Sequence, residues 1–222
     1  MIFGKRRVDS SGPPKALDWN KATDASRDII DYLVNAYKDQ RGTHAETVIG
    51  AAAALSGAYA QRSVQPVAPG IGYVVSDKVF DLMFSGGESG KPLVGIILQF
   101  AESAGVPRDR LPDPQAINQR AVAAFGSSSY PPLSVPQANY PREWSPDATV
   151  RHRGRIDALL ARRHLNPLEG AAALAAATAE LVKLTAKTLD PLIGATLALE
   201  IMIGVAKMRP LEREIASTTA TR

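Results

Sequence analysis

The sequence predicts an all-α fold, a single bundle-like domain of about seven or eight helices with one long loop rich in proline and aromatic residues. Three helix starts support this prediction most strongly: Ser145, Asn166 and Asp190 each precede a proline, and each opens a run rich in alanine and leucine. A capping side chain followed by proline at the first helical position defines where a helix begins. Strand character is confined to 73–75, so a β-rich fold is excluded.

The helices of the N-terminal part are expected over 20–39, 43–62 and 77–84. The second of these should begin at Thr43, whose side chain would form a capping box with Glu46. One face of this helix is nearly smooth because most of its side chains are small, so another helix can pack very close against it. That face consists of Gly50, Ala54, Gly57 and Gln61.

The remaining helices are expected over 92–104, 114–126, 146–163, 167–188 and 191–208. The final one is apolar nearly all round, and its polar line consists of Thr196, Glu200 and Lys207. A helix that is apolar all round is buried. We therefore expect it to lie at the centre of the domain or to form half of a subunit contact.

The composition of the termini predicts the domain boundaries. We expect a flexible basic tail over 1–18, the helical domain over 19–209 and a polar tail over 210–222. Within the domain, 127–144 has no periodicity, and a loop of about 18 residues is uncommon inside a compact domain unless it is a lid, an arm or disordered. We expect an ordered arm or lid that covers a pocket of its own subunit or a neighbouring subunit.

The overall composition restricts the classes of function. The chain of 222 residues has 45% hydrophobic and 22% charged residues, proportions that are typical of a globular protein. It contains no cysteine, which excludes disulfides, cysteine nucleophiles and cysteine-containing zinc sites. The formal charge of +4 is too small to indicate a nucleic-acid partner. The apolar run 191–206 contains Glu200 and is shorter than the roughly 20 residues of a membrane helix. We expect a soluble, cytoplasmic protein without a membrane partner.

Two motifs weakly suggest a cofactor site, and neither is complete. The glycine-rich loop 85–92 contains the Gly-Lys pair of a nucleotide-binding loop, but Pro92 stands where that motif needs a magnesium-binding serine or threonine. The histidines, His44, His152 and His164, lack the spacing to a second ligand that a helical metal site requires. We therefore expect neither a metal nor another cofactor.

Four residues are the candidate ligand-binding set: His44, Tyr59, His152 and Glu200. His44 and Tyr59 share one face of the second helix, and His152 lies on the core-facing stripe of 146–163. Glu200 stands in an apolar helix, where an unpaired buried charge would cost several kcal/mol. The structural alternatives are a neutral core histidine at position 44 and, for Glu200, a pair with Lys207 or with an arginine of another helix.

Arginines form a stripe along one face of the helix at 146–163. Arg151, Arg155 and Arg162 lie within about 40° of one another on that face, an arrangement that could follow a phosphate backbone. No recognition-helix signature accompanies the stripe, and nearby acidic residues offer partners within the chain. We expect a solvated face and no nucleic-acid partner.

Two functions of different classes are consistent with these patterns. The sequence favours a non-catalytic interaction or scaffold protein that forms a homo-oligomer through its apolar final helix and its long loop. The alternative is a small-molecule binding protein or enzyme with a polar pocket inside the bundle. No recognisable catalytic motif is present, and the sequence leaves the question of catalysis open.

Overall fold

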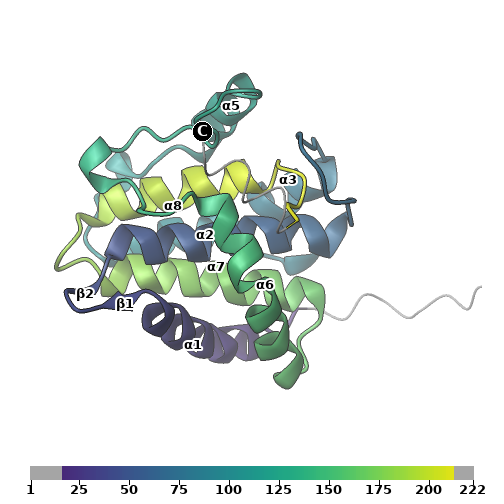
Figure 1. The fold of residues 1–222 in the computed structure, drawn as a ribbon, viewed down its shortest axis with the longest axis horizontal. Helices are drawn as coiled ribbons and strands as arrows, with labels where there is room; N and C mark the ends of the chain where they lie inside the picture. The colour runs from purple at the N-terminus through teal and green to yellow at the C-terminus, as the bar shows by residue number, and fades with distance from the viewer. Residues whose placement is uncertain (1–16, 213–222) are drawn as a thin grey trace, which may run out of the picture.

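Helix α7 (Pro167–Leu184) runs through the middle of the fold, and the other long helices surround it (Figure 1). The computed structural model describes residues 17–212, and this part of the chain forms eight α-helices, which confirms the all-α prediction. α7 packs against α1 (Trp19–Ala36), α2 (Ala45–Val64), α4 (Leu93–Ser103) and α8 (Pro191–Val205). The many alanines of α7 permit this central position, because small side chains let neighbouring helices approach closely.

The remaining helices pack on the outside of this core. α6 (Ser145–Arg162) crosses α2 and reaches α1 (Figure 1). α5 (Pro114–Ala123) packs on α8, and α3 (Asp77–Phe84) packs on α2 and α4. Short 3-10 turns join these helices: η1 (Gly87–Ser89), η2 (Arg108–Arg110) and η3 (Gln137–Asn139). The helix predicted over 77–84 has its predicted bounds, and the ends of the others differ by a few residues.

A short β-hairpin between α1 and α2 was not predicted. Its strands, β1 (Lys38–Asp39) and β2 (Gly42–Thr43), pair antiparallel. The helix predicted over 20–39 therefore ends earlier, at Ala36. At 73–75, where strand character was expected, Tyr73 forms an isolated bridge with Met208.

Local capping sets the starts of α7 and α8, as predicted. The Asn166 side chain accepts a hydrogen bond from the backbone N–H of Glu169, whose carboxylate accepts one from the backbone N–H of Asn166. This reciprocal capping box satisfies two amides at the helix start. At the start of α8 the cap is a single bond, in which the Asp190 side chain accepts from the backbone N–H of Leu192.

Two other predicted helix starts are wrong. Thr43 belongs to β2, and its hydroxyl donates to the carbonyl of Val34, so the N-cap of α2 is His44. Ser145 is already the first residue of α6, and the N-cap is Trp144, which makes no side-chain capping bond.

The smooth face of α2 packs against α8, which confirms the predicted close approach of a second helix. A Cβ atom at Gly57 would collide with the carbonyl oxygen of Met202, so only glycine fits there. One turn further on, the side-chain amide of Gln61 donates to the carbonyls of Ala206 and Met208, at 3.1 and 2.9 Å. These bonds satisfy carbonyls that the end of α8 leaves without a helical partner.

α8 lies at the centre of its own domain, and residues 197–199 are completely buried. Of the two placements predicted for this helix, the structure therefore shows the core. No helix within residues 17–212 has the length and apolar character needed to cross a membrane. Most of the tails expected over 1–18 and 210–222 lies outside the described residues.

Candidate functional site

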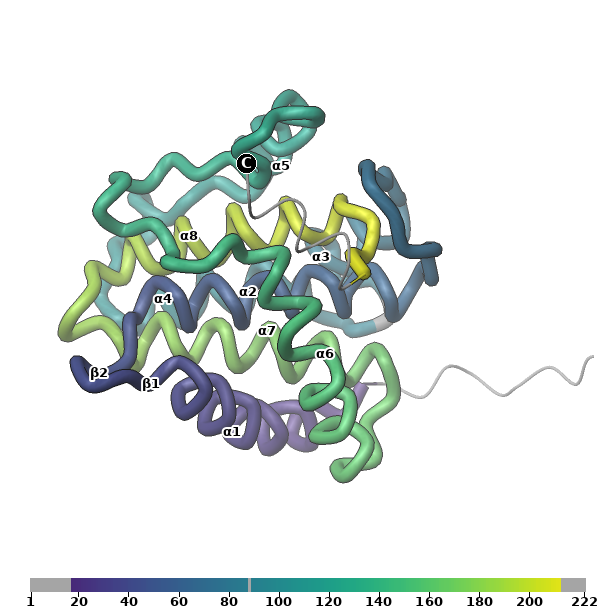
Figure 2. Tube along the Cα trace, in the orientation of Figure 1, coloured from purple at the N-terminus to yellow at the C-terminus, as the bar shows by residue number. Residues whose placement is uncertain are grey.

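The segment 127–144 folds back onto α8 of its own chain (Figure 2). The hydroxyl of Tyr130 donates to the carbonyl of Gly204 at 3.0 Å, and the backbone N–H of Ser134 donates to the Glu200 carboxylate at 2.9 Å. Further along, the indole N–H of Trp144 donates to the carbonyl of Tyr130 at 2.9 Å and closes the segment on itself. These bonds hold the two limbs of the segment in place.

A pocket of about 350 Å³ lies between these two limbs and α8. It is lined by Ser128, Ser129, Tyr130, Pro131, Pro132, Leu133, Tyr140, Pro141, Arg142, Glu143, Trp144, Ser145 and Ile201. The walls are therefore mainly aromatic, prolyl and aliphatic, with a few polar groups. This composition and size are typical of small-molecule sites. We refer to it as the loop pocket.

Glu143 connects the wall of the loop pocket to the interior of the protein. Its side chain is 13% exposed, and its Oε2 accepts a hydrogen bond of 2.5 Å from the Tyr37 hydroxyl. The Arg151 guanidinium lies 3.0 Å from Oε1, outside hydrogen-bonding geometry, and balances the charge of the carboxylate. Burial and the hydrogen bond to Glu143 raise the pKa of Tyr37, so its hydroxyl keeps its proton.

His152 lies behind Tyr37 and is 3% exposed. Its Nε2 is 2.9 Å from the Tyr37 hydroxyl, and its Nδ1 is 2.8 Å from the Tyr32 hydroxyl. Burial, with a smaller effect of the positive Arg151, lowers the pKa of His152 to about 4. The imidazole is therefore neutral near pH 7, and one ring nitrogen donates while the other accepts.

The tautomer of His152 follows from the direction of these hydrogen bonds. Because Tyr37 gives its proton to Glu143, its oxygen can only accept from His152, so Nε2 carries the hydrogen. Nδ1 must then accept from Tyr32. The result is a one-way hydrogen-bond chain that runs from Tyr32 through His152 and Tyr37 to Glu143.

A second carboxyl group, Asp147, lies in the first turn of α6, four residues after Glu143. Its Oδ1 is buried and has no hydrogen-bond partner among the side chains and backbone that the structure describes. Desolvation and the negative charge of Glu143 raise the pKa of Asp147, and Arg151 partly opposes this shift. A buried carboxyl group with a raised pKa beside a second carboxylate is a feature of functional sites.

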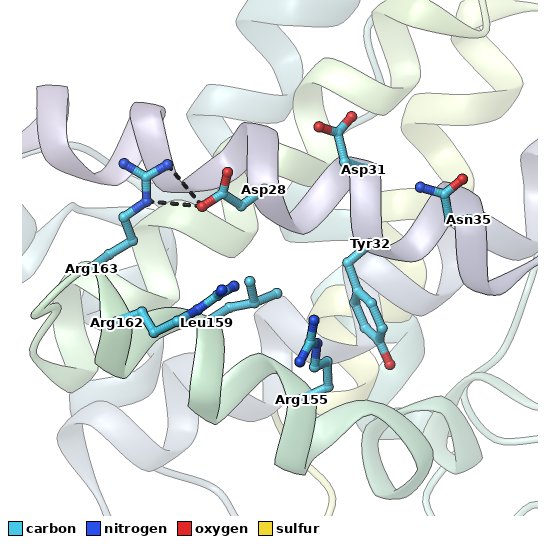
Figure 3. Close-up of a pocket in the computed structure, with 8 residues that line it drawn as sticks. All are labelled: Asp28, Asp31, Tyr32, Asn35, Arg155, Leu159, Arg162 and Arg163. Atoms are coloured by element: carbon cyan, nitrogen blue, oxygen red, sulfur yellow. Dashed lines mark hydrogen bonds and ion pairs between the residues drawn. The ribbon is translucent and has the colours of Figure 1, made fainter.

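At its Tyr32 end, the hydrogen-bond chain reaches a groove of about 730 Å³ between α1 and α6 (Figure 3). Its lining residues are Asp28, Asp31, Tyr32, Asn35, Arg155, Leu159, Arg162 and Arg163. Tyr32 lines this groove and Glu143 lines the loop pocket, so the hydrogen-bond chain joins the two. The predicted arginine stripe is divided between them, since Arg151 pairs with Glu143 while Arg155 and Arg162 line the groove.

The four candidate residues from the sequence have separate hydrogen-bond partners. Tyr59 donates to Asp157 at 2.7 Å, and Nδ1 of His44 lies 2.8 Å from the Thr47 hydroxyl. His152 bonds to Tyr32 and Tyr37, as described above. None of the four lines the loop pocket or the groove between α1 and α6. His152 is the member of this set that the structure places in the hydrogen-bond chain between them.

Glu200 is 1% exposed, and α5 and the loop supply its partners. Nη2 of Arg120 lies 2.7 Å from Oε1, and Ser134 donates its hydroxyl to the same oxygen at 2.5 Å. The arginine of another helix, one of the predicted alternatives, is therefore the partner, and Lys207 is not part of this pair. A buried carboxylate needs such partners to remain charged.

Sequence reasoning missed Tyr32, Tyr37, Glu143 and Asp147 as site residues. The one local signal was the four-residue spacing of Asp147 and Arg151, which places them on one face of α6, with Glu143 just before the start of that helix. Tyr32 lies in α1 and Tyr37 is its C-cap residue, both more than 100 residues away in sequence, and no pattern in the sequence indicated that they would meet His152.

Among the side chains described within residues 17–212, Glu88 excepted, no group of three or more histidine, aspartate or glutamate residues is placed to hold a metal ion. Comparisons with family models, curated proteins and solved structures found no match to this chain.

Proposed function

We propose that the protein binds a small molecule in the loop pocket. The observation that carries this proposal is a 350 Å³ pocket with mainly apolar walls that the long loop forms with α8, with Glu143 of the buried hydrogen-bond chain in its wall. Pockets of this kind, next to groups with perturbed pKa values, are the usual location of ligand sites. The aromatic and prolyl walls favour an aromatic or aliphatic ligand with one or two polar groups.

The oligomeric scaffold, the other function expected from the sequence, was suggested by the apolar final helix and the long loop. The apolar face of α8 is covered by helices and the loop of the same chain. The loop makes its hydrogen bonds to α8 of its own chain. Neither feature requires a second subunit in this arrangement, and the loop pocket supports the proposal of small-molecule binding.

Fluorescence energy transfer from Trp144 to dansyl amide tests the proposal. Trp144 lines the pocket, and Trp19→Phe leaves it as the single tryptophan, since the chain has two. Dansyl amide is an uncharged aromatic probe. Saturable energy transfer is expected, and metabolites that displace the probe would then identify the ligand class.

A pocket-filling variant and a matched control make the result specific. Ser129 is exposed and lines the pocket, so Ser129→Phe should weaken probe binding at least about tenfold by occupying the space. Ser103→Phe places the same side chain at the exposed end of α4 and should leave binding unchanged. Non-saturable transfer, or equal affinity in the two variants, would overturn the proposal.

A further inference from the structure

The groove between α1 and α6 holds more arginine than its acidic residues neutralise. Arg163 is bound at one end by Asp28, whose Oδ2 lies 2.9 Å from Nε and 2.8 Å from Nη2. Both partners of this ion pair line the groove, so their charges balance each other there (Figure 3). It accounts for one of the three arginines and one of the two aspartates that line the groove.

Among the side chains that the structure describes, which do not include Glu88, no carboxylate lies within ion-pair distance of Arg155 or Arg162, although acidic residues line the same groove. Figure 3 shows both guanidinium groups turned into the space between the two helices, while the Asp31 carboxylate points away from them. The Arg155 guanidinium also lies 5.9 Å from the centre of the Tyr32 ring, a contact that helps to hold it over the groove. Two guanidinium groups with free donors therefore face one space.

We infer that this groove binds a small organic molecule through a phosphate or carboxylate group, whose oxygens accept hydrogen bonds from Arg155 and Arg162. The planar guanidinium matches the geometry of such oxyanions. The buried side chain of Leu159 and the ring of Tyr32 offer an apolar floor to the organic part of the molecule. The volume of about 730 Å³ leaves room for both parts.

The acidic residues of α1 favour a small molecule over nucleic acid. Asp28 and Asp31 stand on the wall opposite the arginines. A phosphate backbone that followed the groove would pass these carboxylates and be repelled, whereas a single oxyanion can sit on the α6 side alone.

Titration of the full chain with phenyl phosphate tests this inference. Binding is followed by calorimetry at constant ionic strength, so that general salt effects cancel. Saturable binding is expected, and Arg155→Gln and Arg162→Gln should each weaken it about tenfold, the effect of losing one hydrogen bond to a charged group. Arg110→Gln, a variant of an exposed arginine in η2, should bind as the parent protein does.

Further measurements assign the binding to this groove. Circular dichroism melting verifies that each variant is folded, and Ser129→Phe should leave phenyl phosphate binding unchanged because that residue lines the loop pocket. Absence of binding up to about 10 mM would overturn the inference, as would equal weakening by Arg110→Gln. Tighter binding of single-stranded DNA, lost in the same two arginine variants, would replace the small molecule with nucleic acid.

Discussion

The Nε2 atom of His152 lies 2.9 Å from the hydroxyl of Tyr37, and this contact ties α6 to the end of α1 across a sequence separation of 115 residues. Since Tyr37 in turn donates to Glu143, the histidine can only be the donor. A neutral histidine with both ring nitrogens engaged costs little to bury, whereas a charged one would need a counter-ion that the site uses elsewhere.

Acidification should destabilise the protein through His152. Its pKa is about 4 in the folded protein against an ordinary 6.5, so between these values the unfolded chain holds more protons than the folded one. The neutral, buried His152 therefore contributes to the free energy of unfolding. This contribution is fully present above about pH 6.5, is lost as the pH falls toward 4, and amounts to about 3 kcal/mol at most. Urea unfolding at several pH values measures it. His152→Gln should lose less stability over the same range, and an equal loss would show that other groups titrate.

Nitrogen NMR should find His152 as the neutral Nε2–H tautomer. The direction of the chain from Tyr32 to Glu143 requires Nδ1 to be the acceptor. The ¹⁵N chemical shifts of the two ring nitrogens distinguish a protonated nitrogen from an unprotonated one. A spectrum with the hydrogen on Nδ1 at pH 7 would reverse the chain and contradict this assignment.

Removal of the Tyr37 hydroxyl should destabilise the protein. Tyr37→Phe leaves the Nε2–H of His152 without an acceptor and Oε2 of Glu143 without its donor, and an unsatisfied buried group costs about 1 to 3 kcal/mol. Tyr140→Phe is the control, since that hydroxyl belongs to an exposed residue and makes a long bond of 3.3 Å. Denaturant unfolding should show a clear loss in the first variant alone; equal stabilities would show that the chain contributes nothing.

Glycine substitutions should have opposite effects in α2 and α6. Gly57→Ala forces α2 away from α8, because the added methyl group meets the backbone at Met202 and Ala206, and overpacking costs about 1 to 3 kcal/mol. Gly154→Ala adds a methyl group in open space within α6 and should stabilise the protein by about 0.5 to 1 kcal/mol. Thermal melting of both variants provides the comparison. A stabilised Gly57→Ala protein would contradict the close packing.

Glu200 should control the order of the loop. Its carboxylate accepts hydrogen bonds from both the backbone N–H and the hydroxyl of Ser134, so Glu200→Ala removes one of the attachments of the loop to α8 and leaves the Tyr130–Gly204 bond. Limited proteolysis should then cut within 127–144 faster than in the parent protein, while helical content changes little. Glu102→Ala, on an exposed position of α4, is the control. Unchanged cleavage in Glu200→Ala would mean that the other contacts of the loop suffice.

Several parts of this structure could be predicted because they depend on neighbours in sequence. The capping box at Asn166 and the cap at Asp190 are local hydrogen bonds, and the smooth face around Gly57 follows from helical periodicity. The buried position of Glu200 followed from its apolar neighbours. Its need for a partner followed from electrostatics.

The sequence alone therefore determined the helices, most of their starts and the residues that must be buried, since capping, periodicity and desolvation act within a few residues of each position. Only the tertiary structure decided that Thr43 belongs to a hairpin, that α8 lies in the core, and which groups meet His152. Tyr32 and Tyr37 reach it across 120 and 115 residues. The physical reason is that such a hydrogen-bond chain depends on how α1 and α6 pack, and packing is a property of the assembled surfaces of both helices.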